Sequence, residues 1–311
     1  MVAMVGFRLV GGITHSISLL RQGTKQISQG DLSARITIKS KDELGQLAGS
    51  FNAMVTDLGR MLEEVKEKER LEGELEAARA IQMKLLPQST PQLPGYLIAA
   101  ASLPAKQVGG DYYDFLPHPT GHLSIVVGDV SGKGMPAALL MANLQASLHA
   151  LCESNLEVQD LIARLNRVLF VNTDPQIFAT FFFGLLDPTS GKITYVNAGH
   201  NAPVVCGNGW LEELKTGGLP LGVIQDSAYS LGQTTLKPGE LMALYSDGVV
   251  EATNSTEEEF GEERFIELLK EHRGEEPEAI LQKVIQAVES FCGTPQDDVT
   301  LVIIKRLANA G

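Results

Sequence analysis

The first 90 residues carry helical hydrophobic patterns. Apolar residues recur every three or four positions over Thr14–Gln29 and again over Leu44–Val65, so both segments are predicted to be amphipathic helices. Ser40 and Glu43 have the spacing of a capping box, which predicts Ser40 as the N-cap of the second helix. A further apolar set starts at Leu71, three positions out of phase with the preceding one. A slip of this kind locally overwinds a coiled coil.

The charged stretch Glu63–Arg70 connects the two out-of-phase sets. Two interpretations of it remain open: an ordinary solvated linker helix, or a conformational relay with two registers. Neither amphipathic helix can bury its apolar face alone. We therefore predict a parallel homodimer, in which the helices of two chains form a four-helix bundle.

Three short segments of this region resemble the HAMP module, a signal-relay unit that usually follows a membrane helix. They are Gly30-Asp31-Leu32, Asp42-Glu43-Leu44-Gly45 and Phe51-Asn52-Ala53-Met54. The resemblance implies a HAMP domain over residues 10–63 and a helical coiled-coil linker over residues 64–90. It also implies an upstream membrane or sensor segment, so that the chain is cytoplasmic and tethered to the inner membrane. Met1–Ile13 is apolar apart from Arg8, and it is either the end of such a segment or only one face of a helix; the first interpretation is favoured. The chain has no apolar run of about 18 residues.

The pattern changes after Gly95, where short apolar runs alternate with helical segments. The predicted strands are Tyr96–Ala101, Leu123–Val127, Phe178–Leu186, Lys192–Val196, Ala202–Cys206, Leu241–Tyr245 and Val299–Ile304. The predicted helices are Pro136–Leu151, Glu157–Asn172, Glu262–His272 and Pro277–Phe291. Hairpin connections together with segregated helices predict an α+β fold with mainly antiparallel sheets.

The charge of the chain is uneven. Residues 1–90 carry 12 Lys/Arg and 11 Asp/Glu, a net charge of +1. The remaining residues carry 13 Lys/Arg and 27 Asp/Glu, a net charge of -14, so they account for the total of -13. This acidic part lacks the clustered Lys and Arg that phosphate backbones require, which excludes nucleic acid as a partner. The three cysteines have no paired spacing and are predicted to be small apolar residues in a reducing compartment.

Aspartates gather beside the apolar runs in four glycine-marked segments, Gly109–Asp114, Gly128–Gly134, Ser246–Gly248 and Gln296–Thr300. Any one of these segments is an ordinary turn sequence. Four together predict carboxylates that converge, and like charges at close range repel unless something neutralises them. Carboxylate oxygens suit hard divalent cations such as Mg2+ or Mn2+.

The same segments, with Asn197-Ala198-Gly199-His200-Asn201, resemble the metal-dependent PPM-type serine/threonine phosphatases, and in particular the bacterial branch typified by the SpoIIE and RsbU proteins. The segment Ala77–Gln82, followed by Leu85-Leu86-Pro87, is similar to the linker of that branch. The resemblance implies a phosphatase domain over residues 91–306. Its fold would be a sandwich of two mainly antiparallel β-sheets flanked by helices, with two divalent cations, Mn2+ or Mg2+, between the sheets.

The resemblance also implies a ligand set for the two cations. Asp129 would bridge both ions, and Asp111 would hold one of them. The backbone carbonyl of Val130 matches a further ligand. Asp247 and Asp297 would hold the other ion.

Five more residues are candidates for roles at this site. Asp298 and Asp114 are assigned accessory roles around the metals. Lys106 and Lys133 are candidates for binding phosphate, each set against an ordinary solvated lysine. His200 is either an acid for the leaving group or a structural histidine in a loop, and the second interpretation is favoured.

The implied function is hydrolysis of phosphoserine or phosphothreonine on a regulatory protein, by water that two cations about 4 Å apart activate. The implied target is a STAS-type anti-sigma-factor antagonist, and the HAMP and linker helices would control activity. The alternative is a non-catalytic signalling module that binds the same partner. All implied ligand positions are acidic here, which favours the enzyme. A nucleotide cyclase would need a purine pocket and a basic phosphate clamp, and the sequence has no signature of either.

Overall fold

The computed structural model describes residues 2–40, 42–105, 108–154, 156–173 and 176–308, and the side chains from residue 10 onward within these ranges. The chain divides into two compact units, Met1–Glu74 and Leu75–Gly311. The first unit is helical, and the second holds both β-sheets.

The first unit is built from α1 (Val2–Ser28), the start of α2 (Glu43–Gln82) and the connector between them. Ile36 of the connector is buried, and a Cβ at Gly23 would lie 2.3 Å from its side chain, so only glycine admits Ile36 against α1. The Asn52 side chain holds the same residue from α2, since its amide donates to the Ile36 carbonyl at 2.8 Å and its oxygen accepts from the Ile36 N–H at 2.9 Å. The connector is therefore fixed to both helices.

The predicted cap of the second helix is corrected by the structure. Asp42, and not Ser40, caps α2, because Asp42 Oδ1 accepts hydrogen bonds from the N–H groups of Leu44 and Gly45, both at 3.1 Å. Glu43 is the first residue of the helix, so it cannot stand at the third helical position that a capping box requires.

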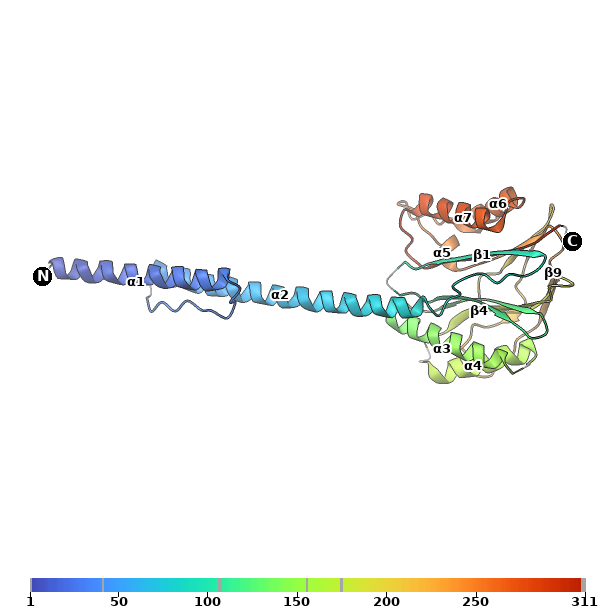
Figure 1. Cartoon of the computed structure of the whole chain (residues 1–311), viewed down its shortest axis with the longest axis horizontal. Coiled ribbons are helices and arrows are strands. Elements are labelled where there is room, and N and C mark those ends of the chain that lie inside the picture. The colour runs from blue at the N-terminus through green and yellow to red at the C-terminus, as the bar shows by residue number, and fades with distance from the viewer. Residues whose placement is uncertain (1, 41, 106–107, 155, 174–175, 309–311) are drawn as a thin grey trace. The chain divides into compact units, whose positions relative to one another are not determined.

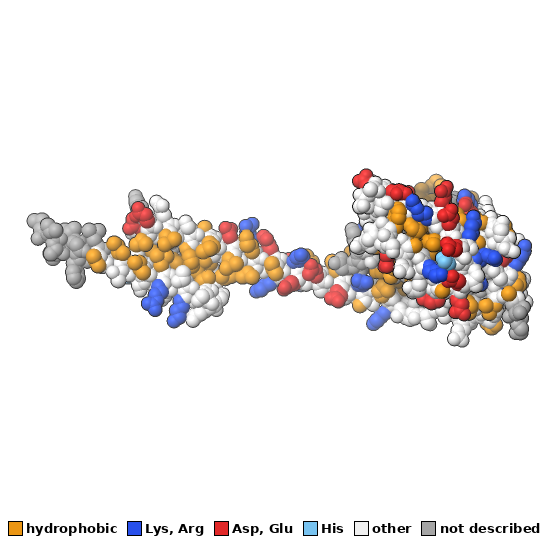
Figure 2. Space-filling model, turned by 90° about the horizontal axis from the view of Figure 1, so that it is seen from above, with side chains coloured by type: hydrophobic (Ala, Val, Ile, Leu, Met, Phe, Trp, Pro, Cys, Tyr) orange, Lys and Arg blue, Asp and Glu red, His pale blue; other side chains and the backbone are white. Residues whose placement is uncertain are grey.

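An uncovered apolar face runs along the first unit. Its exposed side chains include Ile17, Leu47, Met54, Leu58 and Met61. Figure 2 shows hydrophobic side chains following one another along the visible face of this unit. A single chain therefore leaves exposed the apolar seams on which the predicted dimer depends.

The second unit contains two sheets. The first has the strand order β1-β11-β10-β6-β7 and the second β2-β3-β4-β5-β8, with β9 paired to β5. All strand pairs are antiparallel except β5 with β8. The strands are β1 (Tyr96–Leu103), β2 (Asp111–Pro117), β3 (Leu123–Val130), β4 (Ala179–Leu186), β5 (Lys192–Ala198), β6 (Val204–Cys206), β7 (Leu211–Glu213), β8 (Gly217–Gly218), β9 (Gly232–Thr235), β10 (Leu241–Tyr245) and β11 (Val299–Arg306).

Helices cover the outer faces of the two sheets (Figure 1). Helices α3 (Met135–Cys152) and α4 (Val158–Asn172) pack on the second sheet, and α6 (Gly261–His272) and α7 (Pro277–Cys292) lie on the first. Helix α3 is long and apolar enough to span a membrane, but here it packs on the sheet and buries residues such as Met141, Leu144 and Leu148. The predicted α+β sandwich with flanking helices is confirmed.

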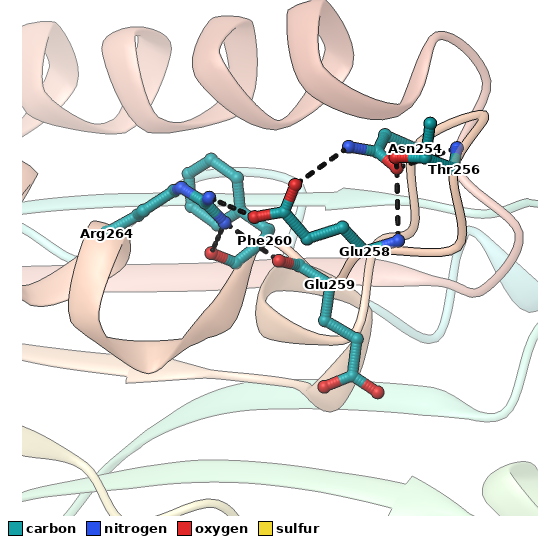
Figure 3. Close-up of polar contacts among 6 residues, drawn as sticks. All are labelled: Asn254, Thr256, Glu258, Glu259, Phe260 and Arg264. Carbon is teal, nitrogen blue, oxygen red and sulfur yellow. Dashed lines mark hydrogen bonds and ion pairs between the residues drawn. The ribbon is translucent and has the colours of Figure 1, made fainter.

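A short helix, α5 (Asp247–Val250), follows β10 and leads into a loop that side chains hold in place (Figure 3). Asn254 Oδ1 accepts hydrogen bonds from the N–H groups of Thr256 at 2.9 Å and Glu258 at 3.0 Å. Arg264 of α6 pairs with Glu258 and donates to the Phe260 carbonyl at 2.8 Å. The chain on the C-terminal side of α5 is thereby anchored to α6.

Candidate metal centre

The pairing of β2 with β3 brings the first two acidic residues together. Asp111 lies directly opposite Asp129 in this antiparallel register, so both side chains project from the same face of the sheet. Gly110 directly precedes Asp111. A Cβ at Gly110 would lie 2.7 Å from the Val130 carbonyl oxygen and 2.9 Å from Asp129 Oδ1. A residue with a side chain would clash with the carbonyl and the carboxylate, which explains the glycine before Asp111.

The other sheet supplies the second acidic pair through the ends of β10 and β11. Ser246 Oγ donates to the Asp298 carbonyl at 3.1 Å and accepts from the Thr300 N–H at 2.9 Å. A Cβ at Gly248 would lie 2.1 Å from the Asp298 carbonyl oxygen, so the close approach of the two segments requires glycine. The sequence Ser-Asp-Gly thus holds Asp247 beside the start of β11.

A pocket of about 270 Å³ lies at the edge of the two sheets. Its polar lining includes Asp129, Asp247, Asp297 and Asp298. Asp111 is buried beside Asp129, and its Oδ2 has no hydrogen-bond partner. Among the described residues, no three His, Cys, Asp or Glu side chains converge tightly enough to enclose an ion.

Burial and mutual repulsion disturb the titration of the acids. Burial raises the pKa of Asp129 to about 7, and the negative charges of Asp247, Asp297 and Asp298 add to the effect. Burial, followed by the charge of Asp129, raises the pKa of Asp111 well above its ordinary value. The pKa of Asp247 is also raised, by burial and then by Asp297. An unpartnered buried carboxylate oxygen among repelling acids fits a site for hard divalent cations.

Lys133 lies in the same pocket. Its Nζ is 2.6 Å from Asp297 Oδ2, and its side chain is half exposed. The flanking residues Gly132 and Gly134 have φ angles of 101° and 81°, which glycine adopts without strain. The role of Lys133 in binding phosphate stays a prediction, and Lys106 lies outside the described residues.

Asp298 has partners that give it a positioning role. Its Oδ1 accepts from the Ala105 N–H and its Oδ2 from the Gly110 N–H, both at 2.8 Å. The carboxylate therefore ties the start of β11 to the backbone just before Asp111.

The accessory role assigned to Asp114 is wrong. Side chains alternate along a strand, so Asp114 projects from the face of β2 opposite to that of Asp111. There, its Oδ2 accepts from the Tyr112 hydroxyl at 2.6 Å and lies 2.6 Å from Nε2 of His149 on α3. Asp114 fastens α3 to the outer face of the sheet.

His200 has the structural surroundings that the favoured interpretation requires. It is buried, its Nδ1 lies 2.9 Å from the Thr180 hydroxyl, and it does not line the pocket. Burial lowers its pKa to about 4, so the ring is neutral near pH 7. Asn197 fixes its backbone, because Asn197 Oδ1 accepts from the His200 N–H at 2.8 Å.

Gln82, the last residue of α2, is a candidate that the sequence did not reveal. Its side chain is buried, with Nε2 donating to the Gly109 carbonyl at 2.7 Å and Oε1 accepting from the Gly109 N–H at 3.2 Å. Gly109 adjoins Gly110, which donates to Asp298. The sequence did contain one sign of this role, because Gln82 is a polar residue in the apolar seam that includes Leu75 and Leu85.

The second unit has the fold of PP2C-type phosphatases, as two similar solved structures show. The RsbU and RsbW domains of Rv1364c from Mycobacterium tuberculosis match with a TM-score of 0.64 and 28% identity, over 72% of this chain and 63% of that chain. The SiaA-PP2C domain of Pseudomonas aeruginosa matches with a TM-score of 0.68 and 20% identity, over 77% of this chain and 98% of that chain. At 20% identity, the second match supports the fold alone.

The chain belongs to the SpoIIE family. The family model "Stage II sporulation protein E (SpoIIE)" matches residues 119–307, and the HAMP domain model matches residues 8–60, which confirms the predicted HAMP region. Protein IcfG of Synechocystis is 31% identical over 98% of this chain, which spans only 53% of IcfG. The phosphoserine phosphatase RsbU of Bacillus subtilis is 31% identical over 77% of this chain and 72% of RsbU. The predicted boundaries at residues 63, 90 and 306 stay predictions.

The raised pKa of Asp129 predicts a pH-dependent stability for the metal-free protein. Because the folded state holds the proton more tightly than the unfolded chain, this group's stabilisation is full below about pH 4 and disappears as pH rises through about 7. We expect the free energy of unfolding to fall by on the order of 3 kcal/mol over that interval. Urea denaturation in chelator should show the fall, and Asp129→Asn should flatten it. A wild-type profile that is flat in chelator would contradict the account of the site.

A second prediction concerns Gln82. The change Gln82→Ala removes both hydrogen bonds to Gly109 and should loosen the backbone before Asp111. We expect Mn2+ affinity to fall about tenfold, or about 1.4 kcal/mol, and the metal-free protein to lose about 1–3 kcal/mol of stability with the two buried hydrogen bonds. Calorimetric titration with Mn2+ measures the effect, and Gln282→Ala on the exposed face of α7 is the matched control. Equal affinity in wild type and both variants would exclude a positioning role.

Proposed function

We propose that this chain is a metal-dependent phosphatase that hydrolyses phosphoserine or phosphothreonine on a regulatory protein. The observation that carries the proposal is the pocket in which acidic side chains from both sheets meet. Membership of the SpoIIE family supports the reaction class, as does the name of the relative RsbU, a phosphoserine phosphatase.

The residues that would hold two divalent cations, Mn2+ or Mg2+, are Asp111, Asp129, Asp247, Asp297 and the carbonyl of Val130. When bound, such ions supply an activated water and neutralise charge on the phosphoryl oxygens. The protein's own part is to gather these oxygens at one end of the two sheets, where bound cations would favour their ionised forms.

The basic side of the pocket would receive the phosphate. Lys133 offers a positive point charge there, without the bidentate geometry of arginine. Helix α3 begins at Met135, directly after Gly134 of the pocket lining, and unpaired N–H groups at a helix N-terminus favour anions. Both features favour a phosphate ester over a neutral substrate.

The proposed substrate is a STAS-type anti-sigma-factor antagonist, as the resemblance to the SpoIIE and RsbU branch implies. Dephosphorylation of such a protein would switch on transcription indirectly. The competing proposal is a non-catalytic module that binds the same partner. The acidic ligand positions favour the enzyme, because a binding module would gain nothing from carboxylates that repel one another.

Hydrolysis of a chromogenic aryl phosphate with Mn2+ separates the two proposals. Asp129→Asn should lower kcat at least about a hundredfold, because it removes the carboxylate that would bridge both cations. The exposed Asp226→Asn should retain wild-type activity. If wild type is inactive, or if Asp129→Asn changes nothing, the chain is not this enzyme.

We further propose that the chain acts as a parallel homodimer, cytoplasmic and tethered to the inner membrane, with α2 relaying the signal. The exposed seam of Met54, Leu58, Met61 and Val65 supports the dimer, since a second copy would bury it. The phase change after Glu63–Arg70 supports two registers of the linker helix.

Insertions of one to seven residues within Glu63–Arg70 test this relay. Each added residue rotates the C-terminal part of α2 by about 100° around the helix axis, relative to the part before the insertion. Phosphatase activity should therefore rise and fall with helical periodicity, while circular dichroism shows that the second unit stays folded. A response independent of insertion length would leave an ordinary solvated linker helix as the interpretation.

A further inference from the structure

A groove of about 580 Å³ lies between the start of α3 and the end of α4, lined by apolar side chains together with Asn143, Asn172 and Thr173. Leu139 and Val171 stand at its rim with 66% and 73% of their surface exposed, and Leu140 and Ile177 also line it. The remaining described lining residues are uncharged. These exposed apolar side chains leave the groove open to apolar groups of a bound partner.

The groove adjoins the metal pocket along the chain before β4. Ile177 lines the groove, and the next residue, Phe178, lines the pocket and is itself 37% exposed. Two hydrogen bonds fix this junction: the Phe178 N–H donates to Ser131 Oγ, and the Ser131 N–H donates to the Phe178 carbonyl, both at 2.9 Å. Ser131 follows the Asp129-Val130 segment directly, so groove and acids are held in one rigid frame.

Helix α3 makes a second connection between the two surfaces. Its N-cap Gly134 lines the pocket, and Pro136 and Leu139, within its first turns, line the groove. A polypeptide whose phosphate enters the pocket can therefore place its neighbouring residues along Phe178 and the start of α3.

We propose that this groove, the α3–α4 groove, binds apolar side chains that flank the phosphorylated residue of the protein substrate. The inference rests on the proposed phosphatase function and adds a basis for substrate choice. The acidic pocket takes the phosphate through its cations, and the groove, whose described lining residues are uncharged, takes the apolar neighbours. A charged side chain would lose hydration there without gaining a described partner of opposite sign.

Two synthetic phosphoserine peptides of equal length and net charge test the proposal. One carries leucine and valine on both sides of the phosphoserine, and the other carries serine and asparagine at the same positions. With Mn2+, wild type should show kcat/KM about tenfold higher for the apolar peptide, the size expected from burying one or two branched side chains. The double variant Leu139→Ser, Val171→Ser should lose this preference through KM, whereas Leu231→Ser, exposed just before β9, should keep it.

Hydrolysis of p-nitrophenyl phosphate separates failure of the groove from failure of the enzyme. The double variant should cleave this small ester at the wild-type rate, since neither residue lines the metal pocket. The groove inference is overturned if wild type cleaves the small ester but shows no preference for the apolar peptide. It is also overturned if the double variant retains the wild-type preference for that peptide. If wild type cleaves no phosphate ester, the proposed function fails and the inference falls with it. A change of oligomeric state in the double variant by sedimentation, with the preference intact, would instead identify an interface between copies.

Discussion

The repulsion among clustered, wholly or partly buried carboxylates is the constraint on which the second unit depends. The register of β2 with β3 sets Asp111 opposite Asp129, and the ends of β10 and β11 bring Asp247 and Asp297 to the same pocket. Ionised acids in this arrangement destabilise the fold at neutral pH unless positive charge is present, because burial and like charges both favour the protonated form. Cations at this site would therefore stabilise the fold and the reaction together.

The backbone around the acids is arranged to tolerate that repulsion. Glycines at positions 110 and 248 admit carbonyl and carboxylate oxygens at distances that a Cβ would forbid. The Asp298 carboxylate, at the start of β11, accepts hydrogen bonds from the backbone before Asp111. Gln82 donates a hydrogen bond to the neighbouring Gly109. The last turn of α2 thus touches the frame of the metal centre directly. A displacement of that helix end would reach the ligands through only two residues.

Much of this fold follows from hydrophobic periodicity in the sequence. The strand Leu241–Tyr245 has its predicted bounds, and the four predicted helices, which correspond to α3, α4, α6 and α7, differ from prediction by at most one residue at each end. Strand β2 was missed, because its polar start, Gly-Gly-Asp-Tyr-Tyr-Asp, has the composition of a turn. That omission also hid the alternation that turns Asp114 away from the pocket. The roles of Gln82 and Asp42 depend on tertiary and local hydrogen bonds that no periodicity encodes.

Anomalous X-ray scattering from crystals grown with Mn2+ tests the central claim most directly. Two adjacent peaks should appear in the pocket, with oxygens of Asp111, Asp129, Asp247 and Asp297 and the carbonyl of Val130 as their protein ligands. Saturating manganese with no anomalous peak among these residues, or with the carboxylates turned away from one another, would contradict the account.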